Sequence, residues 1–278
     1  MTGTALLPFV DAAIQAALAG GSAIMQVYAG QFQVEWKADQ SPITLADRNA
    51  HAAIEAALAS TALPLMSEEG RSFPVHERQA WPLYWLVDPL DGTKEFIARN
   101  GEFAVCIALM LTDTDVRSPL GNASPVAGVV YSPVSDVLYF AWAGGGAYRQ
   151  HDAATHGALP AYERVAMSTR LPLASSARAY TILASRSHRS PETEAFIRRE
   201  EEQHGRVELA FMGSARKFGL MAEGAADAYP RYAPTMEWDT AAGQIICSEA
   251  GKQLIDVTTD APMRYNKNEP VNNWFIVQ

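Results

Sequence analysis

Hydrophobic residues recur at two spacings along the chain, and these spacings separate the expected helices from the expected strands. A return every three or four positions predicts an amphipathic helix near the N-terminus, on Leu7, Val10, Ile14, Leu18 and Met25. The same spacing predicts a helix over residues 44–60, with Ala50, Ile54 and Leu58 inward. Alternation predicts a strand at residues 32–37, and continuous apolar runs at residues 83–89 and 103–111 indicate strands buried on both faces.

The rest of the chain divides into two patterns. Residues 126–149 predict a hairpin, and the glycines that follow its second strand are interpreted as a loop, because no Lys-Ser or Lys-Thr follows them. Beyond residues 151–164 the pattern alternates, with strands expected at 179–185 and 206–211 and helices from Pro191, over 214–224 and over 237–251. We therefore expect an α+β N-terminal subdomain over residues 1–160 and an α/β C-terminal subdomain over residues 161–278.

Composition and charge indicate the cellular compartment and the kind of binding partner to expect. The 278 residues carry a net charge of −9, which argues against binding to polymeric nucleic acid. Two cysteines, both in apolar surroundings, are interpreted as buried thiols in a reducing cytoplasm. Asp11 and Gln15 interrupt the apolar N-terminus, and no Lys or Arg precedes Lys37, so neither a transmembrane segment nor an export signal is expected.

Candidate chemistry is concentrated in the stretch "WLVDPLDGT", residues 85–93. We expect a strand to end at Asp88 and a turn to bring Asp88, Asp91 and the Leu90 carbonyl toward one point. Two clustered carboxylates repel each other unless a proton or a cation lies between them. Oxygen ligands without His or Cys favour Mg²⁺.

Further acids follow other predicted elements. Glu68 and Glu69 end a short apolar run, and Asp239 lies at the start of a helix. Taken singly, an acidic turn or an acid at a helix N-terminus is ordinary structure; in combination they predict a metal site. Phosphatases of the haloacid dehalogenase type place acids two residues apart, whereas Asp88 and Asp91 are three apart, so that reading is disfavoured.

Three motifs in this order, "SEEG", "DPLDGTKEF" and "WDTAAG", resemble those of the inositol monophosphatase superfamily. The "KEF" segment, together with "ASRSH", "GSARKF" and "AEGAADAYPR", is similar to the branch of CysQ-type 3'(2'),5'-bisphosphate nucleotidases. The resemblance implies a layered αβαβα sandwich with the site between its two halves. It also implies hydrolysis of 3'-phosphoadenosine 5'-phosphate to AMP and phosphate, which clears a by-product of sulfate assimilation.

The resemblance also implies a role for each matching residue. Two or three Mg²⁺ ions would be held by Glu68, Asp88, the Leu90 carbonyl, Asp91 and Asp239. Asp47 and Thr93, together with Glu68, would activate and orient the attacking water. The residues implied to contact the substrate are Glu68, Leu90, Asp91, Gly92, Thr93, His188, Ser214, Lys217, Arg231 and Asp239.

Two alternatives stay open at this point. One is an inositol-monophosphatase-like or sugar-phosphate phosphatase, and the other is a non-catalytic protein that binds nucleotides or metal. The expected partner is a small phosphorylated nucleotide. The sequence leaves open the oligomeric state and a loose association with the inner face of a membrane.

Overall fold

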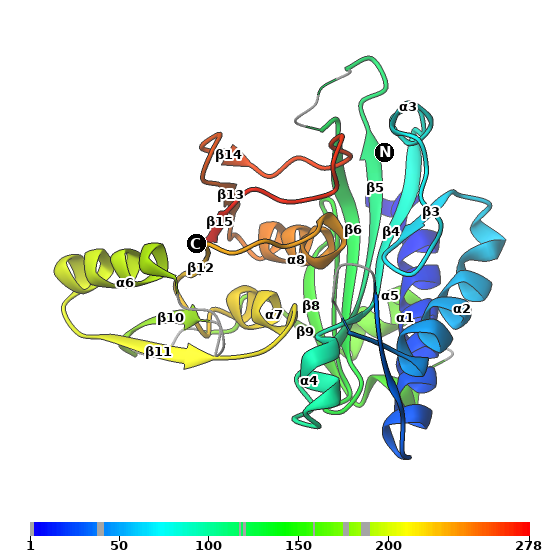
Figure 1. Cartoon of the computed structure of the whole chain (residues 1–278), viewed down its shortest axis with the longest axis horizontal. Coiled ribbons are helices and arrows are strands. Elements are labelled where there is room, and N and C mark those ends of the chain that lie inside the picture. The colour runs from blue at the N-terminus through cyan, green and yellow to red at the C-terminus, as the bar shows by residue number, and fades with distance from the viewer. Residues whose placement is uncertain are drawn as a thin grey trace.

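The chain folds into alternating layers of helices and strands. A computed structural model describes residues 3–37, 42–116, 118, 121–157, 159–174, 178–184 and 190–278. Figure 1 shows a large sheet covered on one side by helices α1 and α2, and on the other by α7 and α8. Beyond α7 and α8 lie further strands and then α6, which completes the expected αβαβα sandwich.

The elements of each layer have the following bounds. The outer helices are α1 (Leu7–Tyr28) and α2 (Leu45–Leu58). The large sheet has the order β3 (Leu65–Ser67), β4 (Leu83–Asp91), β5 (Ala104–Thr112), β6 (Ala123–Ser132), β7 (Val137–Trp142), β8 (Gly146–His151) and β9 (Thr169–Arg170). It is antiparallel except for β3, which runs parallel to β4.

The inner helices are α7 (Arg216–Glu223) and α8 (Glu237–Glu249). Behind them, β10 (Tyr180–Ala184) runs parallel to β11 (Val207–Phe211), and α6 (Pro191–His204) covers the pair. An antiparallel sheet has the order β12 (Tyr229–Arg231), β15 (Phe275–Val277), β13 (Leu254–Asp256) and β14 (Ala261–Pro262). The smaller elements are β1 (Val34–Trp36), β2 (Pro42–Thr44), α3 (Val75–Arg78), α4 (Thr93–Ile97) and α5 (Ala161–Ala166).

Strand β5 divides the protein interior into two cores. Val105, Ile107 and Leu109 face α1 and α2, whereas Cys106 and Ala108 face α7 and α8. Because side chains alternate between the faces of a strand, a continuously apolar run is what burial on both sides requires. The smaller residues lie on the α8 side, where the helix comes close to the sheet.

Small residues let α8 approach the sheet closely. A Cβ added to Gly128 of β6 would lie 2.5 Å from a methyl group of Ile245 and 2.7 Å from the carbonyl oxygen of Ala242. Both of these neighbours belong to α8, so Gly128 has no room for a side chain. The position of α8 matters because its first turn carries Asp239.

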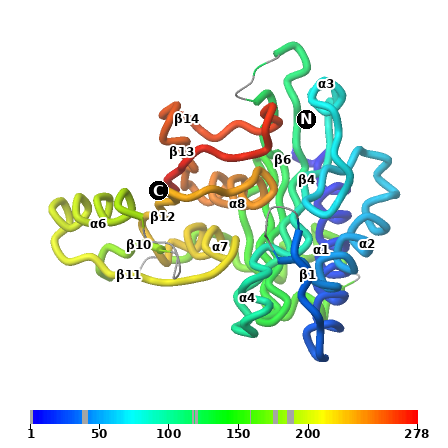
Figure 2. Tube along the Cα trace, viewed as in Figure 1, coloured from blue at the N-terminus to red at the C-terminus, as the bar shows by residue number. Residues whose placement is uncertain are grey.

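Helix α1 buries one of its faces in the protein interior. The segment Gly3–Tyr28 is long and apolar enough to cross a membrane by length and composition. In the fold, however, it packs against α2, β5 and β6, and its residues Val10, Ile14 and Ile24 are fully buried. The predicted amphipathic core helix is therefore confirmed. The tube in Figure 2 shows α1 and α2 side by side along one face of the large sheet.

The structure confirms most expected elements and changes others. Ala50, Ile54 and Leu58 are buried, as predicted. The predicted N-terminal strand is reduced to β1, whose Trp36 is 65% exposed. The prediction that a strand ends at Asp88 was wrong, since β4 continues through Pro89 to Asp91. The subdomain boundary near residue 160 stays a prediction.

The glycines after β7 form a turn, as interpreted from the sequence. The backbone N–H groups of Gly144 and Gly146 donate to the carboxylate of Glu249, at 2.9 and 2.8 Å. The anion held by this turn is thus a side chain at the C-terminal end of α8, and the contact fastens that end of the helix to the sheet.

The close approach of α8 gives a stability prediction. We expect Gly128→Ala to lower the free energy of unfolding by about 1–3 kcal/mol, because the new methyl group overlaps Ile245 and Ala242. Urea unfolding followed by circular dichroism measures this loss. Gly30→Ala is the control, since a Cβ at Gly30 would lie 3.8 Å from the Val27 carbonyl oxygen, an ordinary van der Waals distance. Equal stability of the two variants would contradict the packing described.

Candidate active site

A bulge in β4 brings two aspartates to the same face of the sheet. Asp88 pairs with Cys106 and Asp91 pairs with Ala104, so three steps along β4 match two along β5. Residues three apart on a regular strand point to opposite faces, and the one extra residue of a bulge reverses this relation. The Leu90 side chain lies in the core on the α1 side, while Asp88 and Asp91 both meet Asp239 of α8. Proline is tolerated at bulges, which accounts for Pro89 within a strand.

Asp88, Asp91 and Asp239 form one cluster. One carboxylate oxygen from each lies within 4.8 Å of the others. Each carboxylate also accepts one backbone N–H: Asp88 from Leu90 at 2.9 Å, Asp239 from Met236 at 2.8 Å, and Asp91 from Ala215. Among the described residues no donor reaches the second oxygen of any of the three. The main chain therefore fixes the carboxylates and leaves one oxygen of each available to a ligand.

The cluster is electrostatically unfavourable when it is empty. Burial raises the pKa of Asp88 well above its usual range, and the charges of Glu68, Asp91 and Asp239 raise it further. Burial and the neighbouring Asp91 likewise raise the pKa of Asp239. Burial raises the pKa of Asp91 to about 6, although Lys217 and the Ala215 N–H favour its ionised form. Within the described ranges no cation forms an ion pair with the three, so a bound cation would relieve the repulsion.

Asp47 and Thr93 form a second pair beside the cluster. Asp47 is the third residue of α2, and its Oδ2 accepts both the N–H and the hydroxyl of Thr44, each at 2.7 Å. The Thr93 hydroxyl donates to Asp47 Oδ1 at 3.1 Å and lies 3.4 Å from the Leu90 carbonyl oxygen. Burial raises the pKa of Asp47, and the hydrogen bonds from Thr44 and Thr93 oppose that rise. The Thr93 oxygen keeps its lone pairs free to accept a further hydrogen bond.

Glu68 lies near the cluster but outside the set within 4.8 Å. The Lys37 Nζ forms an ion pair with Glu68 Oε1 at 2.8 Å and a second one with Glu69 Oε1 at 2.5 Å. The sequence reasoning gave Lys37 no role. The basic residue that ends the "FQVEWK" strand was the one available signal.

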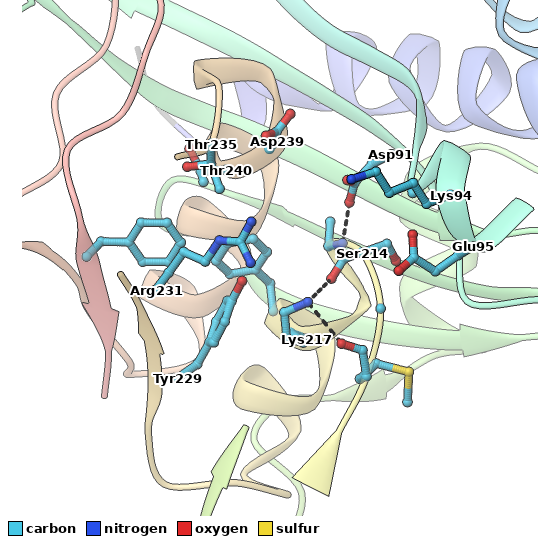
Figure 3. Close-up of a pocket in the computed structure, with 16 residues that line it drawn as sticks. Asp91, Lys94, Glu95, Ser214, Lys217, Tyr229, Arg231, Thr235, Asp239 and Thr240 are labelled. Carbon is cyan, nitrogen blue, oxygen red and sulfur yellow. Dashed lines mark hydrogen bonds between the residues drawn. The ribbon is translucent and has the colours of Figure 1, made fainter. Parts of the chain in front are cut away.

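Three of the predicted substrate residues of the C-terminal half, Ser214, Lys217 and Arg231, line one pocket with Asp91 and Asp239. Figure 3 shows Ser214, Lys217, Tyr229 and Arg231 around this pocket. The Nε of Arg231 is buried and has no hydrogen-bond partner among the described residues, and its Nη2 donates to the Pro234 carbonyl oxygen at 3.4 Å. Lys217 is only 4% exposed, with its ammonium 5.2 Å from the centre of the Tyr229 ring.

Gly92 and His188 are the other two residues predicted to contact the substrate alone. Gly92 lines the pocket with a φ of +96°, a left-handed conformation that favours glycine. His188 lies outside the described residues. The residues that sequence reasoning missed include Thr44, Tyr229 and the backbone N–H of Ala215. Thr44 is the N-cap of α2, three residues before Asp47, so its position at the helix start was an available signal. Ala215 reaches Asp91 from a distant part of the chain. No local motif identifies a main-chain donor.

Comparisons with known proteins agree on one group of relatives. A profile described as the inositol monophosphatase family matches residues 6–274. The 3'(2'),5'-bisphosphate nucleotidase CysQ of Escherichia coli (strain K12) is 40% identical over 269 residues, which covers 95% of this chain and 96% of the relative. The protein of the same name from Salmonella typhimurium (strain LT2) is 42% identical over 247 residues, with 87% and 88% covered.

A solved structure gives the same answer for the fold. The crystal structure of CysQ from Bacteroides thetaiotaomicron matches with a TM-score of 0.87 and 45% identity, over 98% of this chain and 97% of that one. That protein is a bacterial member of the inositol monophosphatase family.

The carboxylate cluster gives a prediction for stability without metal. We expect Asp91→Asn to raise the melting temperature in a chelator, because one of three clustered like charges is removed. Each kcal/mol gained in the free energy of unfolding raises the melting temperature by about 2–4 °C. The gain should grow with pH. The folded-state pKa of Asp91 is raised from 3.8 to about 6, so the wild-type cluster loses stability as pH rises through that interval.

Differential scanning fluorimetry at pH 5 and pH 7.5, with and without Mg²⁺, tests this expectation. Wild type should gain stability from Mg²⁺, and Asp91→Asn should gain little. Asp113→Asn serves as the control, since Asp113 is an exposed acid remote from the cluster. A lower melting temperature for Asp91→Asn in chelator would contradict the repulsion described.

Proposed function

Since the chain belongs to the inositol monophosphatase family, we propose that it removes the 3'-phosphate of 3'-phosphoadenosine 5'-phosphate with the help of Mg²⁺. The protein is a metal-dependent phosphatase, that is, a phosphoric monoester hydrolase. The observation that carries the nucleotide proposal is the pocket itself. Its lining includes Asp91 and Asp239 of the carboxylate cluster. It also includes Arg231, whose buried Nε has no hydrogen-bond partner among the described residues.

The residues present fit a divalent cation. Asp88, Asp91 and Asp239 offer only oxygen ligands; Asp88 is buried and the other two are half-buried, and each has one oxygen that no donor of the described residues reaches. These are the ligands that Mg²⁺ prefers. We propose that they hold two or three ions, together with the Leu90 carbonyl and Glu68. When bound, such ions lower the pKa of a water molecule and neutralise charge on the phosphoryl group.

Asp47 and Thr93 would orient the attacking water. The Thr93 hydroxyl donates its one hydrogen to Asp47. Toward a water molecule, its oxygen can therefore act only as a hydrogen-bond acceptor. A water bound there has one proton directed at Thr93 and a lone pair directed away from it. Asp47 is held by Thr44 through two hydrogen bonds, which fixes this direction before the substrate arrives.

Arg231 would bind the second phosphate of the substrate. A guanidinium group matches two phosphate oxygens with parallel hydrogen bonds. The Nε of Arg231 is buried and unpaired in the structure, so a phosphate would supply a missing partner. Ser214 lines the same pocket and offers a hydroxyl. A substrate with one phosphate would leave Arg231 Nε unpaired.

We also propose that the enzyme acts in the cytoplasm on a small, diffusible nucleotide. Cys106 and Cys247 are both free and buried, as predicted for thiols in a reducing compartment. The negative net charge of −9 fits a small substrate better than a nucleic acid polymer.

A substrate panel tests the proposed function. Purified protein with Mg²⁺ should release phosphate from 3'-phosphoadenosine 5'-phosphate with a higher kcat/KM than from inositol 1-phosphate or fructose 1,6-bisphosphate. Arg231→Met should lower kcat/KM for the bisphosphate nucleotide by about tenfold or more, since a charged hydrogen bond is lost. Preference for inositol 1-phosphate would overturn the nucleotide proposal. No hydrolysis of any substrate would favour a binding protein.

The role of Thr93 gives a separate kinetic prediction. Thr93→Val keeps the shape and removes the hydroxyl, so kcat should fall by about 10²–10⁴ while KM changes little. Thr93→Ser is the matched control and should retain most of the activity. Steady-state kinetics at saturating Mg²⁺ measure both. If Thr93→Val kept a kcat within about twofold of wild type, Thr93 would have no part in orienting the water.

A further inference from the structure

We propose that Lys217 is a positioning residue that holds Asp91 in place through the turn at residues 212–215. This role differs from the substrate contact that the family resemblance implies for the same residue. The inference rests on the proposed function only for the choice of substrates in its test. The contacts that carry it belong to the protein itself.

The Lys217 ammonium is already engaged with the main chain. It donates to the carbonyl oxygen of Met212 at 3.1 Å and to that of Ser214 at 2.9 Å. Figure 3 shows both bonds on the side of the turn away from Asp91. An ammonium group has three donors, so two of the three are used. The ring of Tyr229 lies against the group at 5.2 Å.

The opposite side of the same turn binds two carboxylates. The Gly213 N–H donates to Glu102 Oε2 at 2.7 Å, and the Ala215 N–H donates to Asp91 Oδ2. The carbonyl groups of the turn therefore face a cation while its N–H groups face anions. Each set of contacts orients the peptide groups for the other, because the groups alternate along one short segment.

The conformation of the turn requires such support. Ser214 has a φ of +55°, a left-handed conformation that is costly for a residue other than glycine. A Cβ added to Gly213 would lie 2.7 Å from the Glu95 side chain, so the turn is also packed tightly against α4. Without the Lys217 ammonium the Met212 carbonyl would lose this donor, and the Ser214 carbonyl would keep only the longer bond from the backbone N–H of residue 217, at 3.4 Å. The turn would relax, and the Ala215 N–H would leave Asp91.

Lys217 therefore affects the metal centre indirectly, through the turn at residues 212–215 and Asp91. No ion pair within 4 Å joins it to Asp91 in the described part of the chain, although its charge favours the ionised form of Asp91; the hydrogen-bonded path between the two groups runs through the turn. Groups that orient a metal ligand typically change metal affinity or activity by about 10–100-fold when removed. The expected result is a weaker metal site and a lower kcat, on every substrate alike.

The experiment compares Lys217→Met, Lys217→Gln and Arg231→Met. Calorimetric titration of substrate-free protein with Mn²⁺ measures metal binding without turnover. Steady-state kinetics then compare 3'-phosphoadenosine 5'-phosphate with adenosine 3'-phosphate, which lacks the second phosphate. Lys217→Gln retains two N–H donors for the carbonyls but loses the charge. If Lys217→Met fails to fold, the glutamine variant carries the test, with circular dichroism as the check.

We expect Lys217→Met to weaken Mn²⁺ binding by about 10–100-fold and to lower kcat by the same factor on both nucleotides. Lys217→Gln should recover part of the loss. Arg231→Met should instead raise KM for the bisphosphate alone. A loss in Lys217→Met confined to the bisphosphate, with unchanged Mn²⁺ binding, would overturn the proposal and restore the substrate contact. Because the Mn²⁺ titration uses no nucleotide, its result is independent of whether the proposed substrate is correct.

Discussion

Repulsion among three clustered aspartates is the constraint on which the rest of the site depends. Asp88, Asp91 and Asp239 lie within 4.8 Å of one another with no paired cation among the described residues. Left alone, such a cluster opposes folding, and only the surrounding packing holds it together. The bulge in β4, the close approach of α8 and the backbone N–H groups all serve to maintain this unfavourable arrangement. A site of this kind binds cations because the empty state is high in energy.

The cluster is assembled from both halves of the chain, and the packing between them fixes its dimensions. Asp88 and Asp91 come from one strand of the large sheet, and Asp239 comes from the first turn of α8. Gly128 lets that helix lie against the sheet, and the contact of Glu249 with the Gly144 turn fastens its far end. The distance between the carboxylates is thus set by residues that never touch a ligand. This separation of packing from chemistry explains how the same fold accommodates different substrates.

Most of the fold could be predicted from the sequence, because long periodic segments determine their own structure. The buried faces of α1 and α2 and the two-sided burial of β5 follow directly from residue spacing, and the start of α6 follows from Pro191. The layered architecture came from the motif resemblance rather than from periodicity. The three clustered aspartates were also predicted, although β4 does not end at Asp88. A bulge depends on pairing with β5, which a single segment does not encode.

Other parts of the site could not be predicted because they depend on contacts between distant segments. The pairing of Lys37 with Glu68 and the N–H that Ala215 directs at Asp91 are examples. All three carboxylates of the cluster are oriented by main-chain donors, and this has a consequence for variation among related sequences. A side-chain replacement at Leu90, Ala215 or Met236 cannot delete the hydrogen bond that the position supplies, unless the new residue is proline. The packing of Leu90 and Ala215 in the core still limits which side chains fit there, but the hydrogen bond itself does not depend on that choice. What would remove it is an insertion or deletion that moves the backbone N–H away from its carboxylate.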